Sequence, residues 1–363
     1  MARNAADAAN TFAEFAAPLY VAWEVTHHCN ARCLHCYSNS GPEGDPKNVL
    51  PLDAAFSIVD QLADAGVLVL AFSGGEPLLH PHWEKLVGHA VRRGLSVNVG
   101  SNGSCITPRN ADRLVALGVK SVTVSIDSHL PEIHDEFRRL KGLHSKAVAA
   151  VRLLVERGMR VVVGYTPTRL NWTHGRSVIG LAHDLGASAV NLSEFVPAGR
   201  GGIELALAAT ELRQTLEEWI AAREQYKGRM EVMWHDCRVA LLVADEEKRK
   251  YVGCGAGRLV ARILPDGTVT PCVFLPTSIG NLARAPFTAM WRDAQLLHQF
   301  RARTGHVSGN CGGCEFLESC GGCRAVAYAY SDGDPLAGDP HCWIKGHTPE
   351  ISRLFAAGEG LPV

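Results

Sequence analysis

The stretch that decides the fold is residues 29–37, Cys-Asn-Ala-Arg-Cys-Leu-His-Cys-Tyr, in which three cysteines stand at the spacing C-x3-C-x2-C. It directly follows an apolar run at 19–25, Leu-Tyr-Val-Ala-Trp-Glu-Val, whose length and composition predict a buried strand. We therefore expect the cysteines on the loop that leaves the carboxyl end of this strand.

These three cysteines make an incomplete ligand set for a metal centre. A tetrahedral zinc site and an ordinary four-iron cluster each take four protein ligands, whereas this loop supplies only Cys29, Cys33 and Cys36. A four-iron cluster held here would leave one iron free to bind another molecule. On these residues alone, a zinc knuckle or a chance grouping of cysteines is the alternative.

Composition narrows the class of protein. The 363 residues suffice for a barrel domain and a smaller second domain, and a net charge of −1 without a basic stripe argues against a nucleic-acid partner. No apolar run reaches the roughly 18 residues that a membrane span needs, and residues 1–17 lack the pattern of a signal peptide. With twelve cysteines, these features predict a cytoplasmic protein with metal sites rather than disulfides.

Predicted strands and helices alternate along the first two thirds of the chain. Strands are expected at 19–25, 67–72, 95–100, 119–126, 159–166 and 189–195, and helices at 52–65, 81–93, 107–117, 145–157, 174–185 and 210–226. Near-continuous apolar strands separated by amphipathic helices predict a parallel sheet, here of six β/α units.

Unusual residues follow these strands at their carboxyl ends, where parallel barrels carry their chemistry. Residues 73–77, Ser-Gly-Gly-Glu-Pro, follow the second strand, and their glycines would let the backbone approach a ligand closely. Ser-Asn-Gly at 101–103 follows the third strand, and Ser-Ile-Asp-Ser at 125–128 follows the fourth. The alternatives are a plain glycine turn before a helix and, for Asp127, a turn or helix-cap carboxylate.

The composition changes from about residue 251, where cysteines become frequent. Pro-Asp-Gly at 265–267 predicts a β-hairpin turn, with Cys254 and Cys272 on the same small β element. Two CxxC pairs, 311–314 and 320–323, follow within a short distance and indicate a metal site. One zinc ion bound by the two pairs is the alternative.

Together these features resemble the radical S-adenosylmethionine (SAM) superfamily with a C-terminal SPASM domain. The resemblance covers roughly residues 19–345. It implies an α/β fold in which an open, partial (β/α)6 barrel precedes a small cysteine-rich domain with a β-hairpin. The expected division is an N-terminal extension at 1–18, the barrel at 19–235, the SPASM domain at 236–347 and a tail at 348–363.

The resemblance also implies a role for each motif. Cys29, Cys33 and Cys36 would hold the catalytic cluster, with SAM on its free iron, and cleavage of SAM would give a 5′-deoxyadenosyl radical that takes a hydrogen atom from substrate. The residues implied in SAM binding are Tyr37, Gly74, Gly75, Glu76, Pro77, Ser101, Asn102, Ser125, Asp127, Arg138 and Gly164. Glu194 and Arg200 follow the sixth strand and are candidate substrate contacts, or else the solvated charges of a turn.

The SPASM resemblance implies two auxiliary four-iron clusters. The implied ligands are Cys254, Cys272 and Cys323 for the first cluster, and Cys311, Cys314, Cys320 and Cys342 for the second. The first set lacks a fourth thiolate, so either Cys237 supplies it or one iron stays open. The chain departs from the family pattern at Cys320 and Cys323, which have two intervening residues rather than three. Cys105 falls outside both patterns and is expected to be a buried or loop thiol.

We therefore expect a radical SAM/SPASM oxidoreductase that uses SAM and three 4Fe-4S clusters. An external one-electron reductant of the flavodoxin or ferredoxin type is implied. The implied substrate is a ribosomal peptide, presented by a separate carrier protein, or a haem (tetrapyrrole) precursor. A dehydrogenase, epimerase or decarboxylase of a small-molecule natural product is the alternative within the family. A non-catalytic iron–sulfur or zinc redox protein is the alternative outside it, but it leaves residues 74–77 without a purpose.

Iron analysis tests the expected number of clusters. Anaerobically reconstituted protein should be brown, oxygen-sensitive and contain about twelve irons per chain, because each of the three clusters holds four. A content of about four irons, or stoichiometric zinc, would contradict the two auxiliary clusters.

Overall fold

The computed structural model describes residues 16–243, 245–248 and 251–344. Ten strands form one curved sheet in the order β10-β9-β8-β1-β2-β3-β4-β5-β6-β7. Its parallel core consists of β1 (Tyr20–Glu24), β2 (Val69–Ser73), β3 (Ser96–Ser101), β4 (Ser121–Ser125), β5 (Arg160–Tyr165), β6 (Ala189–Ser193) and β7 (Glu231–His235). The predicted partial barrel is confirmed, and β7 adds a strand that the sequence analysis missed.

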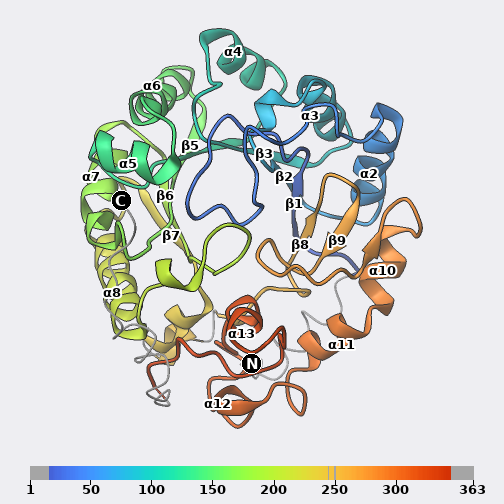
Figure 1. The fold of residues 1–363 in the computed structure, drawn as a ribbon, viewed down its shortest axis with the longest axis vertical. Coiled ribbons are helices and arrows are strands. Elements are labelled where there is room, and N and C mark those ends of the chain that lie inside the picture. The colour runs from blue at the N-terminus through green and yellow to red at the C-terminus, as the bar shows by residue number, and fades with distance from the viewer. Residues whose placement is uncertain (1–15, 244, 249–250, 345–363) are drawn as a thin grey trace.

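Helices cover the outer face of this sheet (Figure 1). They are α2 (Leu52–Asp64), α3 (Trp83–Arg92), α4 (Pro108–Ala116), α5 (Pro131–Arg138), α6 (Leu143–Val155), α7 (Gly175–Asp184) and α8 (Ala209–Gln225), with 3-10 turns η1 (Pro77–Leu79), η2 (Trp172–His174) and η3 (Ile203–Leu205). Among the described residues, no helix combines the length and apolar character that crossing a membrane requires. The short helix α5 was not predicted, and it carries one of the implied SAM residues.

The two faces of the strands differ in chemistry. Large apolar side chains such as Leu70, Val99 and Val163 are buried in the core with the helices. The side chains that alternate with them are small or polar, as in the cross-strand neighbours Gly100 and Thr123. A closed parallel barrel fills its interior with branched side chains. Here the side chains that face the barrel interior, the lumen, are small or polar, and Gly100, Thr123 and Gly164 are only half-buried.

The C-terminal region continues the same sheet beyond β1. Strand β8 (Val260–Ile263) pairs with β1 in parallel, and β9 (Thr268–Thr270) and β10 (Gly280–Asn281) follow antiparallel. The predicted hairpin is thus present, and it covers the edge of β1 that a partial barrel would otherwise leave unpaired. The division of the chain at residue 235 stays a prediction, and the expected N-terminal extension and tail lie largely or wholly outside the described residues.

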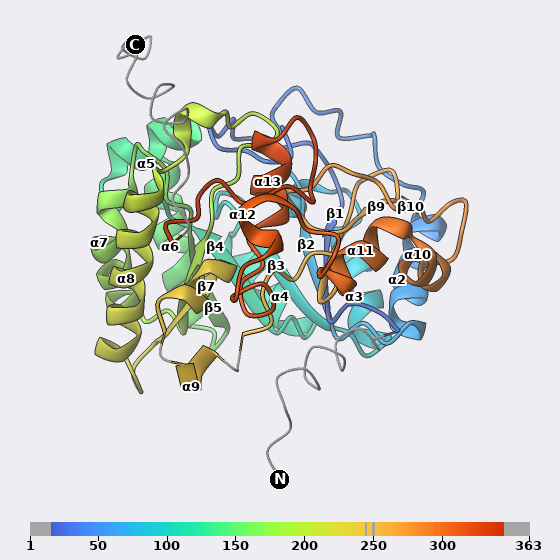
Figure 2. The ribbon, with the colours of Figure 1, turned by 90° about the horizontal axis from the view of Figure 1, so that it is seen from below.

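The remaining C-terminal elements lie along the open side of the sheet. They are η4 (Cys237–Leu241), α9 (Asp245–Lys248), α10 (Phe287–Asp293), α11 (Gln295–Ala302), α12 (Gly309–Gly312) and α13 (Arg324–Tyr330). Figures 1 and 2 show α11, α12 and α13 bridging the space between β7 with α8 on one side and β8–β10 on the other. The cysteine-rich region therefore lies across the open side of the partial barrel.

Candidate functional site

The three loop cysteines lie together after β1. Cys29 and Cys33 are buried and Cys36 is half-buried, and all three pack with Ala31 and Leu143 in one small apolar cluster. None of the twelve cysteines is in a disulfide. Burial raises the pKa of the Cys29 thiol to about 12, so a thiolate here needs a bound cation to offset its desolvation.

Arg200 holds this loop from the end of β6. Its guanidinium donates to the carbonyl oxygens of Cys33 and Ser40, each at 2.8 Å, and its backbone N–H donates to the carbonyl of Cys36 at 2.9 Å. Arg200 was a candidate substrate contact on the sequence alone. In the structure its donors are committed to the cysteine loop, so we describe it as a positioning residue.

Gly74 and Gly75 admit the backbone that leads into the cysteine loop. A Cβ on Gly74 would lie 2.4 Å from the carbonyl oxygen of Thr26, and one on Gly75 would lie 2.1 Å from that of His28. Gly74 also has a φ of +125°, which favours glycine. The sequence analysis attributed these glycines to a ligand; the structure adds that the protein's own backbone already requires them.

Glu76 connects the loops that follow β1, β2 and β3. Its fully buried carboxylate accepts from the Ser101 hydroxyl at 3.0 Å and from the Asn102 N–H at 2.8 Å. Burial raises its pKa to about 7 despite these donors. The Asn102 side-chain amide in turn lies 3.7 Å from the Cys29 sulfur and donates to Asn30 at 2.9 Å. Pro77 begins η1 directly beside this group.

Asp127 and Arg138 form a buried ion pair beside the cysteines, with the Arg138 Nε 2.6 Å from the carboxylate. Burial opposes ionisation of Asp127, but the guanidinium, together with His35 and His134, holds the pKa of this carboxyl below its usual range. Arg138 also lies 3.9 Å from the Cys33 sulfur, and Thr166 donates its N–H to Asp127 at 3.2 Å. A positive charge is therefore fixed next to a cysteine that would carry negative charge.

Two polar residues that were not predicted, Asn191 and His235, lie on β6 and β7, beside the predicted SAM residues Ser125 and Gly164. Ser125 is the neighbour of Gly164 in register, and Gly164 is the neighbour of Asn191. The Asn191 amide nitrogen donates to Ser193 at 3.1 Å and lies 3.4 Å from a ring nitrogen of His235, while its buried oxygen has no partner among the described residues. The signal was present as a single asparagine inside an apolar strand.

His235 lies deep in the molecule yet remains open to solvent. Surrounding protein lowers the pKa of its imidazole, while its side chain is exposed. A side chain that faces the lumen can be surrounded by protein and still be exposed to solvent. The inner face therefore presents the imidazole of His235 to a bound molecule, whereas the Asn191 oxygen is covered by protein.

The C-terminal cysteines fall into two groups. Cys311, Cys314, Cys320 and Cys342 line one cavity. Cys254, Cys272 and Cys323 pack in a separate apolar cluster together with Cys237. The two groups match the two ligand sets that the family resemblance implies, and Cys237 joins the set that lacked a fourth member.

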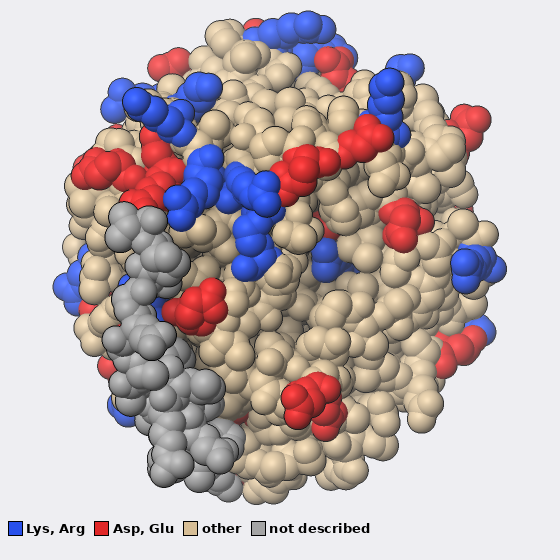
Figure 3. Space-filling view, in the orientation of Figure 1, with Lys and Arg blue, Asp and Glu red and all other residues tan. Residues whose placement is uncertain are grey.

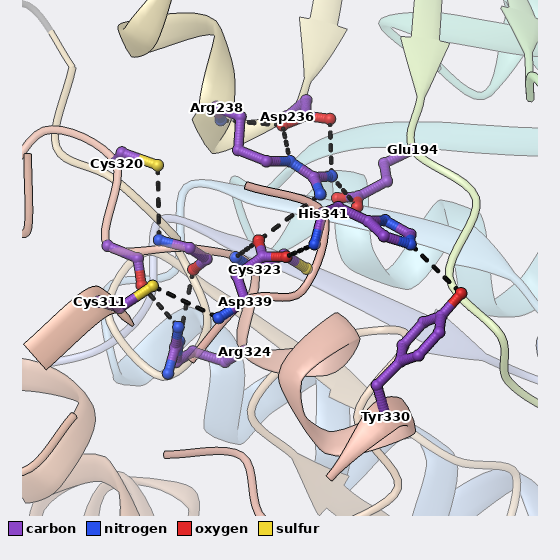
Figure 4. A network of polar contacts seen from close by, with 12 residues as sticks. Glu194, Asp236, Arg238, Cys311, Cys320, Cys323, Arg324, Tyr330, Asp339 and His341 are labelled. Carbon is purple, nitrogen blue, oxygen red and sulfur yellow. Dashed lines mark hydrogen bonds and ion pairs between the residues drawn. The ribbon is translucent and has the colours of Figure 1, made fainter. Parts of the chain in front are cut away.

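A buried arginine lines the cavity of the first of these groups, and Figure 4 shows its contacts. Arg238 is fully buried, donates to Asp236 at 2.9 Å and to Glu194, and lies 3.5 Å from Asp339. Asp339 accepts the N–H of Cys323 at 2.7 Å. Glu194 was expected at the barrel mouth as a substrate contact; it is instead buried in this network, which ties β6 to the cysteine-rich region.

Known proteins share this arrangement. The profile of the "Radical SAM superfamily" matches residues 23–173, and that of the SPASM "Iron-sulfur cluster-binding domain" matches residues 254–323. The AdoMet-dependent heme synthase of Methanosarcina barkeri is 30% identical over 339 residues, covering 90% of this chain and 96% of that protein. The chain belongs to the radical SAM superfamily. It carries a C-terminal SPASM domain.

Two further relatives show how wide this family is. The mycofactocin maturase MftC of Mycobacterium tuberculosis is 32% identical over 347 residues, covering 93% of this radical SAM/SPASM chain and 86% of MftC. The crystal structure of Streptococcus suis SuiB bound to its precursor peptide SuiA has a TM-score of 0.76 at 16% identity, covering 94% of this chain and 79% of SuiB. This second likeness shows the fold alone.

The residues of the radical SAM/SPASM enzyme fit the cofactors of its family. A four-iron cluster would offset the charge of the buried loop thiolates, and SAM would meet Glu76 and Arg138, groups of opposite charge that suit its amino and carboxylate groups. The protein thus uses SAM with a radical SAM 4Fe-4S cluster and SPASM iron–sulfur chemistry.

Tyr37 connects the radical SAM loop with the SPASM region. Its ring meets Phe274 edge-on at 5.4 Å between centroids, and the Arg262 guanidinium lies over its face at 5.4 Å. The Phe274 N–H donates to the Cys272 sulfur at 3.3 Å, and Arg262 pairs with the buried Glu24 of β1 at 2.7 Å. The family resemblance implied a SAM contact for Tyr37. The structure adds a packing role for its ring between the cysteine loop and the group that contains Cys272.

Charges of both signs are interspersed on the face that Figure 3 shows. Basic and acidic groups lie side by side in its upper half, and its lower central part, over the SPASM elements of Figure 1, carries few charges. Among the described residues on this face, no large area has a single sign. Long-range steering by a field of one sign is therefore not a feature of this face.

The Gly75→Ala substitution tests the close backbone approach. The added Cβ would clash with the His28 carbonyl, so we expect a loss of about 2 kcal/mol or more in the free energy of unfolding, measured by denaturant titration. The control is Gly180→Ala in α7, where a Cβ would meet nothing within 4 Å. That change should keep or slightly raise stability. Equal unfolding midpoints for the two variants would contradict the packing argument.

The Arg238→Met substitution tests the buried network. It leaves buried carboxylates without their cation, so we expect a loss of about 3–5 kcal/mol, again by denaturant titration. Arg292→Met serves as the control, because Arg292 pairs with its neighbour Asp293 on the surface, and it should leave the midpoint unchanged. An Arg238→Met protein as stable as the wild type would show that the network does not hold the two regions together.

Proposed function

We propose that this radical SAM/SPASM enzyme is an oxidoreductase that removes hydrogen from a peptide bound in the barrel lumen. The observation that carries this proposal is the small, polar inner face, on which Thr123 and Gly164 are half-buried and His235 is exposed. The amides of a peptide would find hydrogen-bond partners on such a face, because hydroxyl and imidazole groups can donate or accept. The maturase MftC, at 32% identity, supports a peptide substrate.

A haem precursor is the second candidate substrate. Support comes from the heme synthase of Methanosarcina barkeri, which is 30% identical and is covered over 96% of its length. A flat macrocycle would have to bury its apolar faces against the lumen. The polar inner face is the reason that we place it second.

The chain's own residues prepare the site for the reaction. Cys29, Cys33 and Cys36 would hold the catalytic cluster, and bound SAM with that cluster supplies a 5′-deoxyadenosyl radical that takes a hydrogen atom from substrate. Arg138, fixed by Asp127, would hold the SAM carboxylate and offset charge on the cysteines. The remaining implied SAM residues lie around the same loop ends.

The wider setting follows from this chemistry. An external one-electron reductant of the flavodoxin or ferredoxin type would feed the cluster, and a separate carrier protein would present a peptide substrate. A reducing cytoplasm would keep the twelve cysteines available as ligands. Three 4Fe-4S clusters remain the proposed complement.

The Cys33→Ala substitution tests the radical step. With dithionite and SAM under anaerobic conditions, the wild type should form 5′-deoxyadenosine and the variant should form none, because the loop has no spare thiolate. The variant should still contain about eight irons in its auxiliary clusters. Cys105→Ala, which alters a cysteine outside both patterns, is the control and should behave as the wild type. Wild-type rates in Cys33→Ala would contradict the assignment of the loop.

Porphyrin binding separates the two substrate candidates. An iron porphyrin titrated into the reconstituted protein should leave the Soret band unshifted if the substrate is a peptide. A saturable shift at one porphyrin per chain would favour the haem precursor instead.

A further inference from the structure

We infer that Cys237 is the fourth protein ligand of the first auxiliary cluster, which is therefore closed to substrate. The inference rests on the proposed function, because it takes Cys254, Cys272 and Cys323 as ligands of one four-iron cluster. The family pattern of cysteines does not include a residue at this place. The structure supplies the reason to add it.

The fold around Cys237 holds this residue in place. This residue opens η4, the turn that directly follows β7. Asp236 caps the turn by accepting the N–H of Arg238 at 2.8 Å, and the buried Arg238 guanidinium returns to the same carboxylate. The backbone of Cys237 is thus held between two residues whose side chains are locked in the buried network (Figure 4). A cysteine on such a turn is preorganised rather than mobile.

Cys237 lies among the thiols of the incomplete first set. It packs in the same apolar cluster as Cys254, Cys272 and Cys323. Cys254 is the common member: it lies close enough to Cys237, Cys272 and Cys323 to interact electrostatically with each of them. Four cysteines from η4, the β8–β9 region and the start of α13 therefore meet in one apolar environment, which is the donor set of a four-iron cluster.

Cys237 is not assigned to the second auxiliary cluster. The Cys237 thiol is in hydrogen-bond contact with that of Cys320, a member of the other set. That set, however, already has four cysteines lining one cavity, and Cys237 is not among the residues that line it. The contact instead means that one cysteine of the first set lies against one cysteine of the second.

Counting supports the same assignment. Of the twelve cysteines, three lie in the loop and seven fit the SPASM pattern, so only Cys105 and Cys237 are left. Cys105 follows β3, contacts Ser104 and packs against the main apolar core, not in the cluster that holds Cys254, Cys272 and Cys323. Cys237 is the remaining cysteine that the fold brings to the incomplete set.

The consequence concerns what the first auxiliary cluster does. A four-iron cluster with four thiolates offers no free iron, so it cannot anchor substrate through a bond to iron. Electron transfer is the role that a cluster with a complete set of thiolates would keep.

Controlled oxidation of the reconstituted full chain tests the ligand assignment. Brief ferricyanide treatment removes the iron that lacks a thiolate, leaving a three-iron cluster that electron paramagnetic resonance counts. The wild type has one such iron, in the loop cluster, and Cys237→Ala should have two, so the signal should double. Loss of about a third of the iron from Cys237→Ala would also support the inference, because the cluster would then depend on this thiolate. The matched control, Cys105→Ala, should equal the wild type in signal and iron.

Two outcomes would overturn the inference. One is a Cys237→Ala protein with the wild-type signal and iron content. The other is a wild type that already shows the doubled signal, because the first cluster would then be open. Formation of 5′-deoxyadenosine by the wild type tests the proposed function separately. If the wild type cleaves SAM and either outcome is seen, only the assignment of Cys237 fails.

Discussion

The structure depends on the contact between two backbone segments that carry no catalytic atoms. The carbonyl oxygens of Thr26 and His28 press against Gly74 and Gly75 so closely that a side chain on either glycine would collide with them. This contact fixes the loop after β1 against the loop after β2. Glu76 then follows at a set position, reaches Ser101 and Asn102, and brings the end of β3 to Cys29. The cysteines are placed by this chain of short contacts.

Buried charge pairs join the barrel to the cysteine-rich region. Arg262 of β8 pairs with Glu24 at the end of β1, and Arg238 of η4 pairs with Glu194 after β6 and approaches Asp339. Buried pairs of this kind add little net stability, because desolvation offsets the attraction, but an unpaired member is costly. They therefore select one arrangement of the two regions. In that arrangement Phe274, which donates its N–H to Cys272, contacts the ring of Tyr37 at the end of the radical SAM loop.

The inner face of the sheet gives the enzyme its working space. Gly100, Thr123, Gly164 and Asn191 occupy strand positions where a closed barrel would carry branched side chains. The C-terminal elements lie over the open side of this lumen (Figure 2). One half of the site thus comes from the strands, and the other comes from a region far away in sequence.

Much of this protein was determined by local sequence. The spacing of Cys29, Cys33 and Cys36, the apolar run before them and the two CxxC pairs are patterns within a few residues, so strand, loop and metal chemistry could be predicted directly. What only the tertiary structure decided are contacts between distant segments: Arg200 on the cysteine loop, Glu194 in a buried network, Asn191 beside His235, and Cys237 among the SPASM cysteines. Strand β7 belongs with these, because its sequence has charged and polar ends and becomes a strand through pairing with β6. The physical reason is that periodicity and spacing show which residues face the core. The partner of a buried polar group instead depends on which strands and loops become neighbours in space.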